Sequence, residues 1–111
     1  MMETMNWPET IRRCFDSERV LYSTHARREM RLEEFGPIAD QEIYEAVCDG
    51  EVIETYPEDT PYPSVLIFGR TNGNRPIHAV YAYNDEDDQV VVVTVYQPDP
   101  KFWEDYRRRK R

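Results

Sequence analysis

The sequence is poor in cysteine and histidine, and each shortage excludes a class of protein. Two cysteines among 111 residues, Cys14 and Cys48, cannot form a disulfide-rich scaffold, and no C-x-x-C spacing joins them. We expect both to be reduced thiols buried in helices. The two histidines form neither H-x-x-x-H nor H-E-x-x-H, and the acidic run 85–88 lacks calcium-loop spacing. Neither a metal nor a cofactor is therefore expected.

Glycine and long hydrophobic runs are also scarce. With four glycines the chain has no P-loop, G-x-G-x-x-G or G-x-S-x-G pattern, which removes support for nucleotide binding and acyl transfer. The apolar run at residues 90–93 is far shorter than a membrane span, and the N-terminal residues lack the basic start and apolar stretch of a secretion signal. We expect a cytoplasmic protein without a membrane segment.

Positive charge is scarce overall but concentrated at one end. The formal charge of −8 argues against indiscriminate nucleic-acid binding, because phosphate contacts need a positive surface. Residues 101–111 nevertheless hold six lysines and arginines against two acids. This basic tail could contact RNA or an acidic partner, or it could be a solvated charged end.

The hydrophobic period changes along the chain from helical to alternating near residue 50, and the length fits one domain with one core. Helix caps are expected at Asn6, at Ser23 or Thr24, and at Asp40, with helix ends near residues 35–37 and at Gly50. Strands are expected at 51–56, 64–70, 75–83 and 89–97, and a short helix after Asp99-Pro100. The predicted fold is α+β, a single domain over 1–111 with N-terminal helices packed on one face of a small antiparallel β-meander.

The dipeptide Asn72-Gly73 sets the expected register of the meander, because it favours a two-residue hairpin loop. Such a loop pairs Thr71 with Asn74 and places His78 opposite Ile67.

The next hairpin decides which residues accompany His78. If Tyr83 pairs with Gln89, His78 faces Thr94, and Tyr96 lies on the same side of the sheet. The opposite side is expected to lie under the helices. It would carry Leu66, Phe68, Ile77, Ala79, Tyr81, Val91, Val93 and Val95.

A histidine beside a hydroxyl and a phenol on an open sheet face could hold a phosphate or move a proton, since the ordinary imidazole pKa is near neutrality. His78, Thr94 and Tyr96 would form such a cluster. The alternative is a partly buried His78 that simply hydrogen-bonds to its neighbours.

His25 lies in the first turn of the second helix, where free backbone amides attract anions. Nearby arginines, Arg28 and Arg31 among them, could grip a phosphate. Acidic residues at 29, 33 and 34 interrupt this basic stretch, so a solvated helix face is the alternative.

Several short motifs, taken together, resemble the domain of unknown function 4258 family over about residues 22–100. They are Tyr22-Ser-Thr-His-Ala26, Met30, Gly50-Glu-Val-Ile-Glu54, Tyr56-Pro57, Gly69, Arg75-Pro-Ile-His78 and Thr94-Val-Tyr-Gln-Pro98. That family is similar to RelE-type and barnase-like ribonuclease folds, in which helices cover one face of a small antiparallel sheet and the other face is open. Some members are similar to toxins that pair with an antitoxin.

The resemblance implies a metal-independent, RNA-cleaving domain with an antitoxin-like protein partner. Its motif positions make His25, His78, Thr94 and Tyr96 the candidate catalytic residues, and His25 would approach His78 across the sheet edge. One histidine would take the 2′-hydroxyl proton and the other would protonate the leaving oxygen. The candidate substrate-binding residues are Arg28, Arg31, Arg70 and Arg75, of which Arg70 or Arg75 would offset phosphorane charge.

The chain departs from the family pattern at Glu29 and Glu33, where arginine is more usual, and at Gly36-Pro37, a small insertion. The competing function is a non-catalytic protein-interaction module with a RelE-like fold, which binds a protein through its acidic sheet face or its basic tail. The sequence leaves the oligomeric state open.

Overall fold

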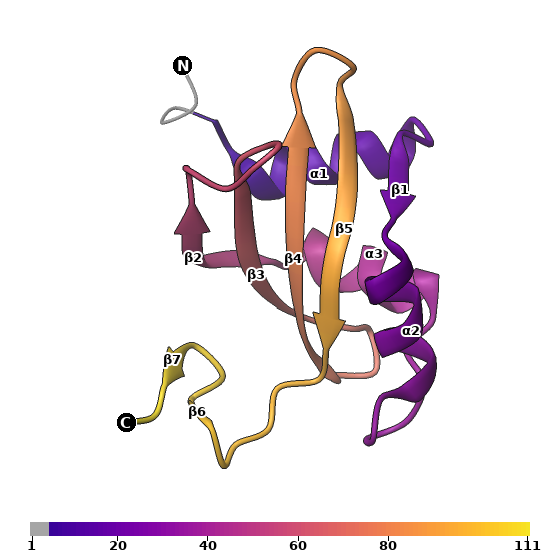
Figure 1. Cartoon of the computed structure of the whole chain (residues 1–111). Helices are drawn as coiled ribbons and strands as arrows, with labels where there is room; N and C mark the ends of the chain where they lie inside the picture. Colours follow the sequence, from indigo (N-terminus) through magenta and orange to yellow (C-terminus); the bar gives the residue numbers. More distant parts are fainter. Residues whose placement is uncertain (1–4) are drawn as a thin grey trace.

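The computed structural model describes residues 5–111 and has an α+β architecture, which confirms the predicted fold class (Figure 1). The prediction that no secretion signal is present rests partly on residues 1–4, which lie outside this range. None of the helices in residues 5–111 is long and apolar enough to cross a membrane. The elements are α1 (Trp7–Asp16), β1 (Val20–Tyr22), α2 (Thr24–Leu32), α3 (Asp40–Cys48), β2 (Glu51–Tyr56), β3 (Ser64–Arg70), β4 (Pro76–Asn84), β5 (Gln89–Tyr96), β6 (Trp103–Glu104) and β7 (Arg108–Arg109).

The main sheet has the strand order β1-β5-β4-β3-β2 and is mixed rather than wholly antiparallel. Strands β2 to β5 form the predicted meander. β1 adds a parallel edge, with Val20 beside Val90 and Tyr22 beside Val92. This strand escaped prediction because three residues between the end of one helix and the cap of the next show no alternation.

Side-chain caps begin two of the three helices as predicted. The Asn6 carboxamide accepts from the Glu9 amide at 3.1 Å, and the Ser23 hydroxyl accepts from the Ala26 amide at 2.9 Å. The predicted Asp40 cap is wrong, because Ala39 occupies the cap position. The Glu42 carboxylate, in the first turn of the helix, accepts from the Ala39 amide at 3.0 Å and so supplies a partner for this backbone donor at the helix N-terminus.

Residues 71–75 join β3 to β4, with three residues, 72–74, between Thr71 and Arg75, so the predicted two-residue turn is wrong. The Thr71 amide donates to the Arg75 carbonyl at 2.9 Å, and Asn74 adopts a left-handed conformation with φ of 68°. Asparagine tolerates that conformation and thereby closes the longer loop. As a result Phe68, not Ile67, pairs with His78.

A β-bulge between β4 and β5 restores the predicted alternation of the side chains near His78. The hairpin begins by pairing Asn84 with Gln89, one residue later than predicted. The register then shifts by one more residue between Tyr81 and Val80. His78 consequently pairs with Tyr96, and Val80 pairs with Thr94. The predicted pairing of His78 with Thr94 is wrong, but alternation still places His78, Thr94 and Tyr96 on one face.

The helices pack on the other face, which forms the core. This face presents Val65, Ile67, Ile77, Ala79, Tyr81, Val90, Val92 and Val95 to buried helix residues such as Ile11, Met30, Ile43 and Val47. The predicted placement of Leu66, Phe68 and Val91 under the helices is wrong, because the register places them on the opposite face.

Helix α3 lies unusually close to β3 at Gly69. A Cβ atom built there would lie 1.8 Å from the Ala46 carbonyl oxygen. Only glycine permits this approach of helix backbone to strand backbone.

The two thiols differ in exposure. Cys14 is buried as predicted, whereas Cys48 at the end of α3 is exposed, and both are free. The prediction of a buried Cys48 is wrong because this last residue of α3 lies outside the buried face formed by Ile43, Ala46 and Val47.

The C-terminal residues form a hairpin, not the predicted helix. The short strands β6 and β7 are joined by three residues, 105–107, of which Asp105 and Tyr106 have positive φ, at 55° and 60°. Positive φ at two successive residues is incompatible with a right-handed helix. Figure 1 shows this segment, in yellow, leaving the end of β5 and returning toward the β2 side of the sheet.

Candidate active site

The sheet face turned away from the helices, here called the second face, gathers polar and aromatic side chains from four strands. A bulge in β2 at Ile53 keeps Glu51, Glu54 and Tyr56 on this face, since Glu51 pairs with Phe68, Glu54 with Leu66 and Tyr56 with Ser64. β4 and β5 add His78, Thr94 and Tyr96. The C-terminal hairpin covers the face that the sequence predicted to be open.

His78 is the centre of the cluster and is completely inaccessible to solvent. Its Nε2 lies 2.6 Å from the Tyr106 carbonyl oxygen, and its Nδ1 lies 3.1 Å from the Tyr96 hydroxyl. Because a carbonyl oxygen can only accept, Nε2 carries the proton and Nδ1 accepts from the Tyr96 hydroxyl. The indole of Trp103 packs edge-on against the imidazole, with centroids 4.4 Å apart.

Burial controls the protonation of this pair. Burial lowers the pKa of His78 to about 4, although the hydrogen bond to the Tyr106 carbonyl and the charge of Glu54 act in the opposite direction. Burial likewise raises the pKa of Tyr96 to about 12. At neutral pH both groups are uncharged, so the closed site holds a neutral imidazole and a neutral phenol.

Glu54 is the ionised member of the cluster. Its carboxylate accepts from the Arg109 guanidinium at 2.9 and 3.0 Å and from the Tyr56 hydroxyl at 2.5 Å. The hydrogen bonds from Arg109 and Tyr56 lower the pKa of Glu54. A carboxylate base therefore lies on the same face as the imidazole.

Arg70 supplies a second positive charge at the edge of this face. Its guanidinium lies 5.4 Å from the Phe68 ring centroid and 5.3 Å from that of Tyr106. No carboxylate pairs with it among residues 5–111. Arg70 thus remains available for an anion.

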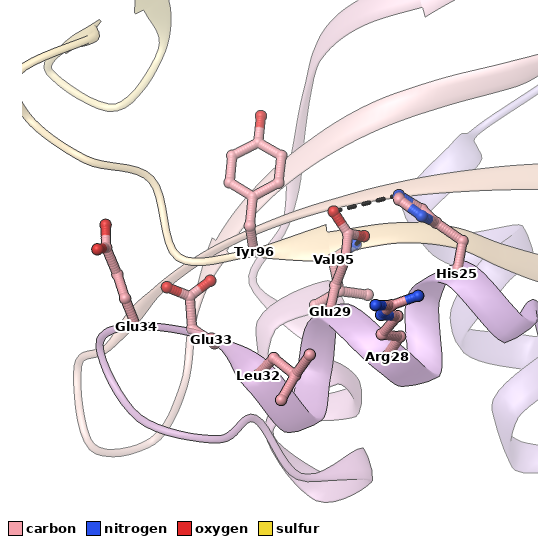
Figure 2. Close-up of a pocket in the computed structure, with 8 residues that line it drawn as sticks. All are labelled: His25, Arg28, Glu29, Leu32, Glu33, Glu34, Val95 and Tyr96. Atoms are coloured by element: carbon pink, nitrogen blue, oxygen red, sulfur yellow. Dashed lines mark hydrogen bonds and ion pairs between the residues drawn. The ribbon is translucent and has the colours of Figure 1, made fainter.

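His25 and Arg28 lie in a separate groove of about 470 Å³ between α2 and the end of β5 (Figure 2). The His25 side chain is 64% exposed, and its Nε2 lies 3.3 Å from the Glu29 carboxylate. Tyr96 lines the groove as well, so this residue connects it to His78. No hydrogen bond or ring contact joins the two histidines within the described range.

The two glutamates that depart from the family pattern have a structural role in this groove. Glu29 accepts from the Val95 amide at 2.9 Å, and Glu33 accepts from the Gln97 amide at 3.0 Å. In the described part of the chain no strand continues this edge of β5 beyond Tyr22, so carboxylates from α2 and its C-cap satisfy backbone donors that would otherwise lack partners.

The remaining predicted binding residues differ in availability. Arg28 and Arg31 are exposed on α2. Arg75 is only 18% exposed and is tied down inside the fold. Its guanidinium donates to Gln97 Oε1 at 2.7 Å, to the Pro37 carbonyl at 3.0 Å, to Glu42 at 3.2 Å and to the Gly36 carbonyl.

Arg75→Lys is expected to lower the free energy of unfolding by about 2 kcal/mol. A single ammonium cannot reach acceptors arranged around several edges of the planar guanidinium, so the Gly36 and Pro37 carbonyls and Gln97 cannot all keep their donor. Arg31→Lys, at an exposed position, should change stability by less than about 0.5 kcal/mol. Urea unfolding of both variants measures the difference, and equal stabilities would rule out the structural role of Arg75.

Three of the four catalytic residues predicted from the sequence lie together, and five further residues of the cluster were not predicted. His78, Thr94 and Tyr96 share the second face, whereas His25 does not. The missed residues are Glu54, Tyr56, Trp103, Tyr106 and Arg109. Glu54 and Tyr56 stand in the family-like motif and alternate in β2, which was a usable signal, but the bulge that aligns them was not visible. Within residues 5–111 no group of three histidine, cysteine or acidic side chains could hold a metal ion.

The combination of three helices on one face and a polar cluster on the other defines a small α+β domain with a potential acid–base site. Residues 22–97 match the family described as Domain of unknown function (DUF4258), so the chain belongs to this family. No curated protein and no solved structure matches the chain. The similarity to RelE-type and barnase-like ribonucleases therefore stays a prediction.

Proposed function

We propose that the protein is a metal-independent endoribonuclease of the toxin type, with its active site on the second face of the sheet. The observation that carries this proposal is the convergence of a carboxylate, an imidazole and a guanidinium on that face, at Glu54, His78 and Arg70. These are the groups that RNA cleavage without a metal requires. The three strands that supply them, β2, β3 and β4, are neighbours in one sheet, which suits a site that must hold its geometry.

The reaction would proceed by attack of the 2′-oxygen on the adjacent phosphorus. Glu54 accepts the 2′-hydroxyl proton as the 2′-oxygen–phosphorus bond forms. His78, protonated to the imidazolium once water reaches it, gives that proton to the 5′-oxygen as the phosphorus–5′-oxygen bond breaks and returns to the neutral imidazole. The products are a 2′,3′-cyclic phosphate and a 5′-hydroxyl, and Arg70 offsets the charge that develops on the phosphorane.

The other predicted residues have supporting roles in this mechanism. Tyr96 orients the imidazole through Nδ1, and Thr94 borders it on the same face. His25 and Arg28 bind the RNA strand along the adjoining groove rather than react. The substrate and an antitoxin-like protein are the proposed partners, and the cytoplasm, where RNA is exposed, is the proposed site of action.

A non-catalytic interaction module is the second candidate, and one observation favours it. His78 is fully buried and both of its ring nitrogens already have partners, which is the usual state of a structural histidine. The two candidates differ in whether His78 ever meets a substrate.

The test is cleavage of a single-stranded RNA oligonucleotide by the purified protein in EDTA. The wild type should produce 2′,3′-cyclic phosphate ends, and His78→Gln should lower the rate at least 100-fold, because loss of one proton-transfer group costs about that much. Glutamine remains uncharged and can donate to the Tyr106 carbonyl, so it preserves the fold better than alanine would.

His25→Gln serves as the matched histidine control and should retain cleavage within about tenfold. If the wild type leaves the RNA intact at an equimolar ratio, and its expression alone neither slows growth nor degrades cellular RNA, the ribonuclease function is wrong. A stable complex with a protein partner would then support the interaction module.

A further inference from the structure

The C-terminal residues 99–111, here called the strap, are attached to the sheet by side chains and by a single carbonyl. Backbone hydrogen bonds of the strap join only its own residues, as from the Lys110 amide to the Phe102 carbonyl at 2.9 Å, and none in the described range links it to β2–β5. The family match ends at Gln97, just before the strap begins. The strap therefore packs on the domain without pairing, in the described range, with any strand of the main sheet.

The strap occupies the positions that a substrate would need. The Tyr106 carbonyl fills the hydrogen-bonding position at His78 Nε2, and the Trp103 indole, only 6% exposed, covers the imidazole. The Tyr106 ring lies 5.8 Å from the Phe68 ring, where an unstacked base could otherwise lie. With the strap in place, no phosphate can reach His78.

Two arginines of the strap neutralise the carboxylates of β2. Arg107 donates to both Glu51 oxygens at 3.1 Å, and Arg109 pairs with Glu54 at 2.9 Å. Arg108 differs, because it pairs with Glu104 inside the strap itself. The basic tail is thus bound to the acidic sheet edge of its own chain.

The strap carries a conformational cost that favours release. Asp105 and Tyr106 both occupy the left-handed region, and for a residue as bulky as tyrosine this costs on the order of 1–2 kcal/mol. The Tyr106 carbonyl that holds His78 therefore sits in the strained turn of the hairpin.

We propose that the strap is an autoinhibitory lid: it covers Glu54 and His78 in the free protein and must swing away, through the Pro98–Pro100 connection, before RNA can bind. This inference rests on the proposed ribonuclease function and adds its regulation. RNA phosphates would compete with Glu51 and Glu54 for Arg107 and Arg109, so the substrate itself would help to open the site.

The chain offers an internal control for testing the lid, because it has one covered and one exposed histidine. Diethyl pyrocarbonate acylates accessible, unprotonated imidazoles, and mass spectrometry reports each histidine separately. In the wild type His25 should react readily, while His78 should be protected at least tenfold. In Arg107→Ala/Arg109→Ala the His78 rate should rise at least tenfold, and raising the ionic strength should increase it in the wild type. Arg108→Ala, which removes a strap arginine that makes no ion pair with the sheet, should behave as wild type.

The same variants are then tested for RNA cleavage, which separates the lid from the activity. The double variant should cleave at least tenfold faster than the wild type, and Glu51→Gln, which loosens one tie from the sheet side, should fall between them. If His78 is unprotected in the wild type, or stays protected in the double variant, the strap is not a lid over His78. If both proteins cleave RNA equally while His78 is protected only in the wild type, the strap does not inhibit the enzyme, but the proposed ribonuclease function is retained. Opening without any cleavage would retain the lid and reject the ribonuclease.

Discussion

Gly69→Ala is expected to lower the free energy of unfolding by roughly 4 kcal/mol or more, or to prevent folding. The added Cβ would lie 1.8 Å from the Ala46 carbonyl oxygen and 2.6 Å from its carbon, far inside van der Waals contact. Both neighbours belong to the backbone of α3, so no rotamer change relieves the clash, and the helix must move off the sheet. Ile43 and Val47 would then lose contact with the core. Overpacking of this kind lies at the severe end of single substitutions.

Gly73→Ala is the matched control for that substitution. The nearest atom to a Cβ at Gly73 is the Thr71 hydroxyl oxygen at 3.7 Å, an ordinary contact, and Gly73 does not require a positive φ. The free energy of unfolding of Gly73→Ala should lie within about 1 kcal/mol of that of the wild type, because alanine fits at this position and restricts the conformations of the unfolded chain. Urea unfolding of both proteins provides the comparison. If Gly69→Ala loses no more stability than Gly73→Ala, α3 does not pack on β3 as described.

Local patterns predicted the class of the fold and most of its elements, whereas longer-range geometry escaped them. Asn6 and Ser23 act on amides three residues away, so caps of this kind are visible in sequence. The register of paired strands depends on loop conformations and bulges, and these depend on small displacements of the backbone that no sequence pattern indicates. The loop at Asn74 shifted the β3–β4 register by one residue without compensation, whereas in the β4–β5 hairpin the one-residue shift at Asn84 was followed by a bulge between Tyr81 and Val80 that restored the predicted alternation. The shared face of His78 and Tyr96 was thus predicted correctly although each individual pairing was wrong.

The covering of the site could not be predicted for a related reason. Residues 101–111 carry the charge pattern of a solvated helix end, and nothing local indicates that Arg107 and Arg109 would meet carboxylates more than fifty residues away in β2. In the hairpin turn Asp105 tolerates positive φ, but Tyr106 seldom adopts it, so the Asp-Tyr pair is a weak turn signal. Tertiary ion pairs and an aromatic contact to His78 decided the conformation of this segment instead of its helix propensity.

Protein stability should fall by about 3 kcal/mol between pH 7 and pH 4 through His78 alone. Burial lowers the pKa of His78 to about 4 in the folded protein, against an ordinary value of 6.5. The unfolded chain therefore binds a proton between these two values while the folded chain does not. Stability from this group is fully present above pH 6.5 and is lost as the pH falls toward the folded pKa, and the difference in pKa corresponds to about 3 kcal/mol.

His78→Gln should remove this loss between pH 6.5 and 4, because glutamine does not titrate. It should leave the loss at lower pH, where Glu54, whose pKa is lowered by Arg109, gains its proton in the unfolded chain first. His25→Gln, which removes an imidazole that is 64% exposed, is the matched control for the loss of a histidine. Urea unfolding at half-unit pH intervals measures all three proteins. If His78→Gln shows the same slope as the wild type between pH 6.5 and 4, His78 is already open to water in the folded protein. The strap would then not seal the site, and the imidazole would be ready for proton transfer without any opening step.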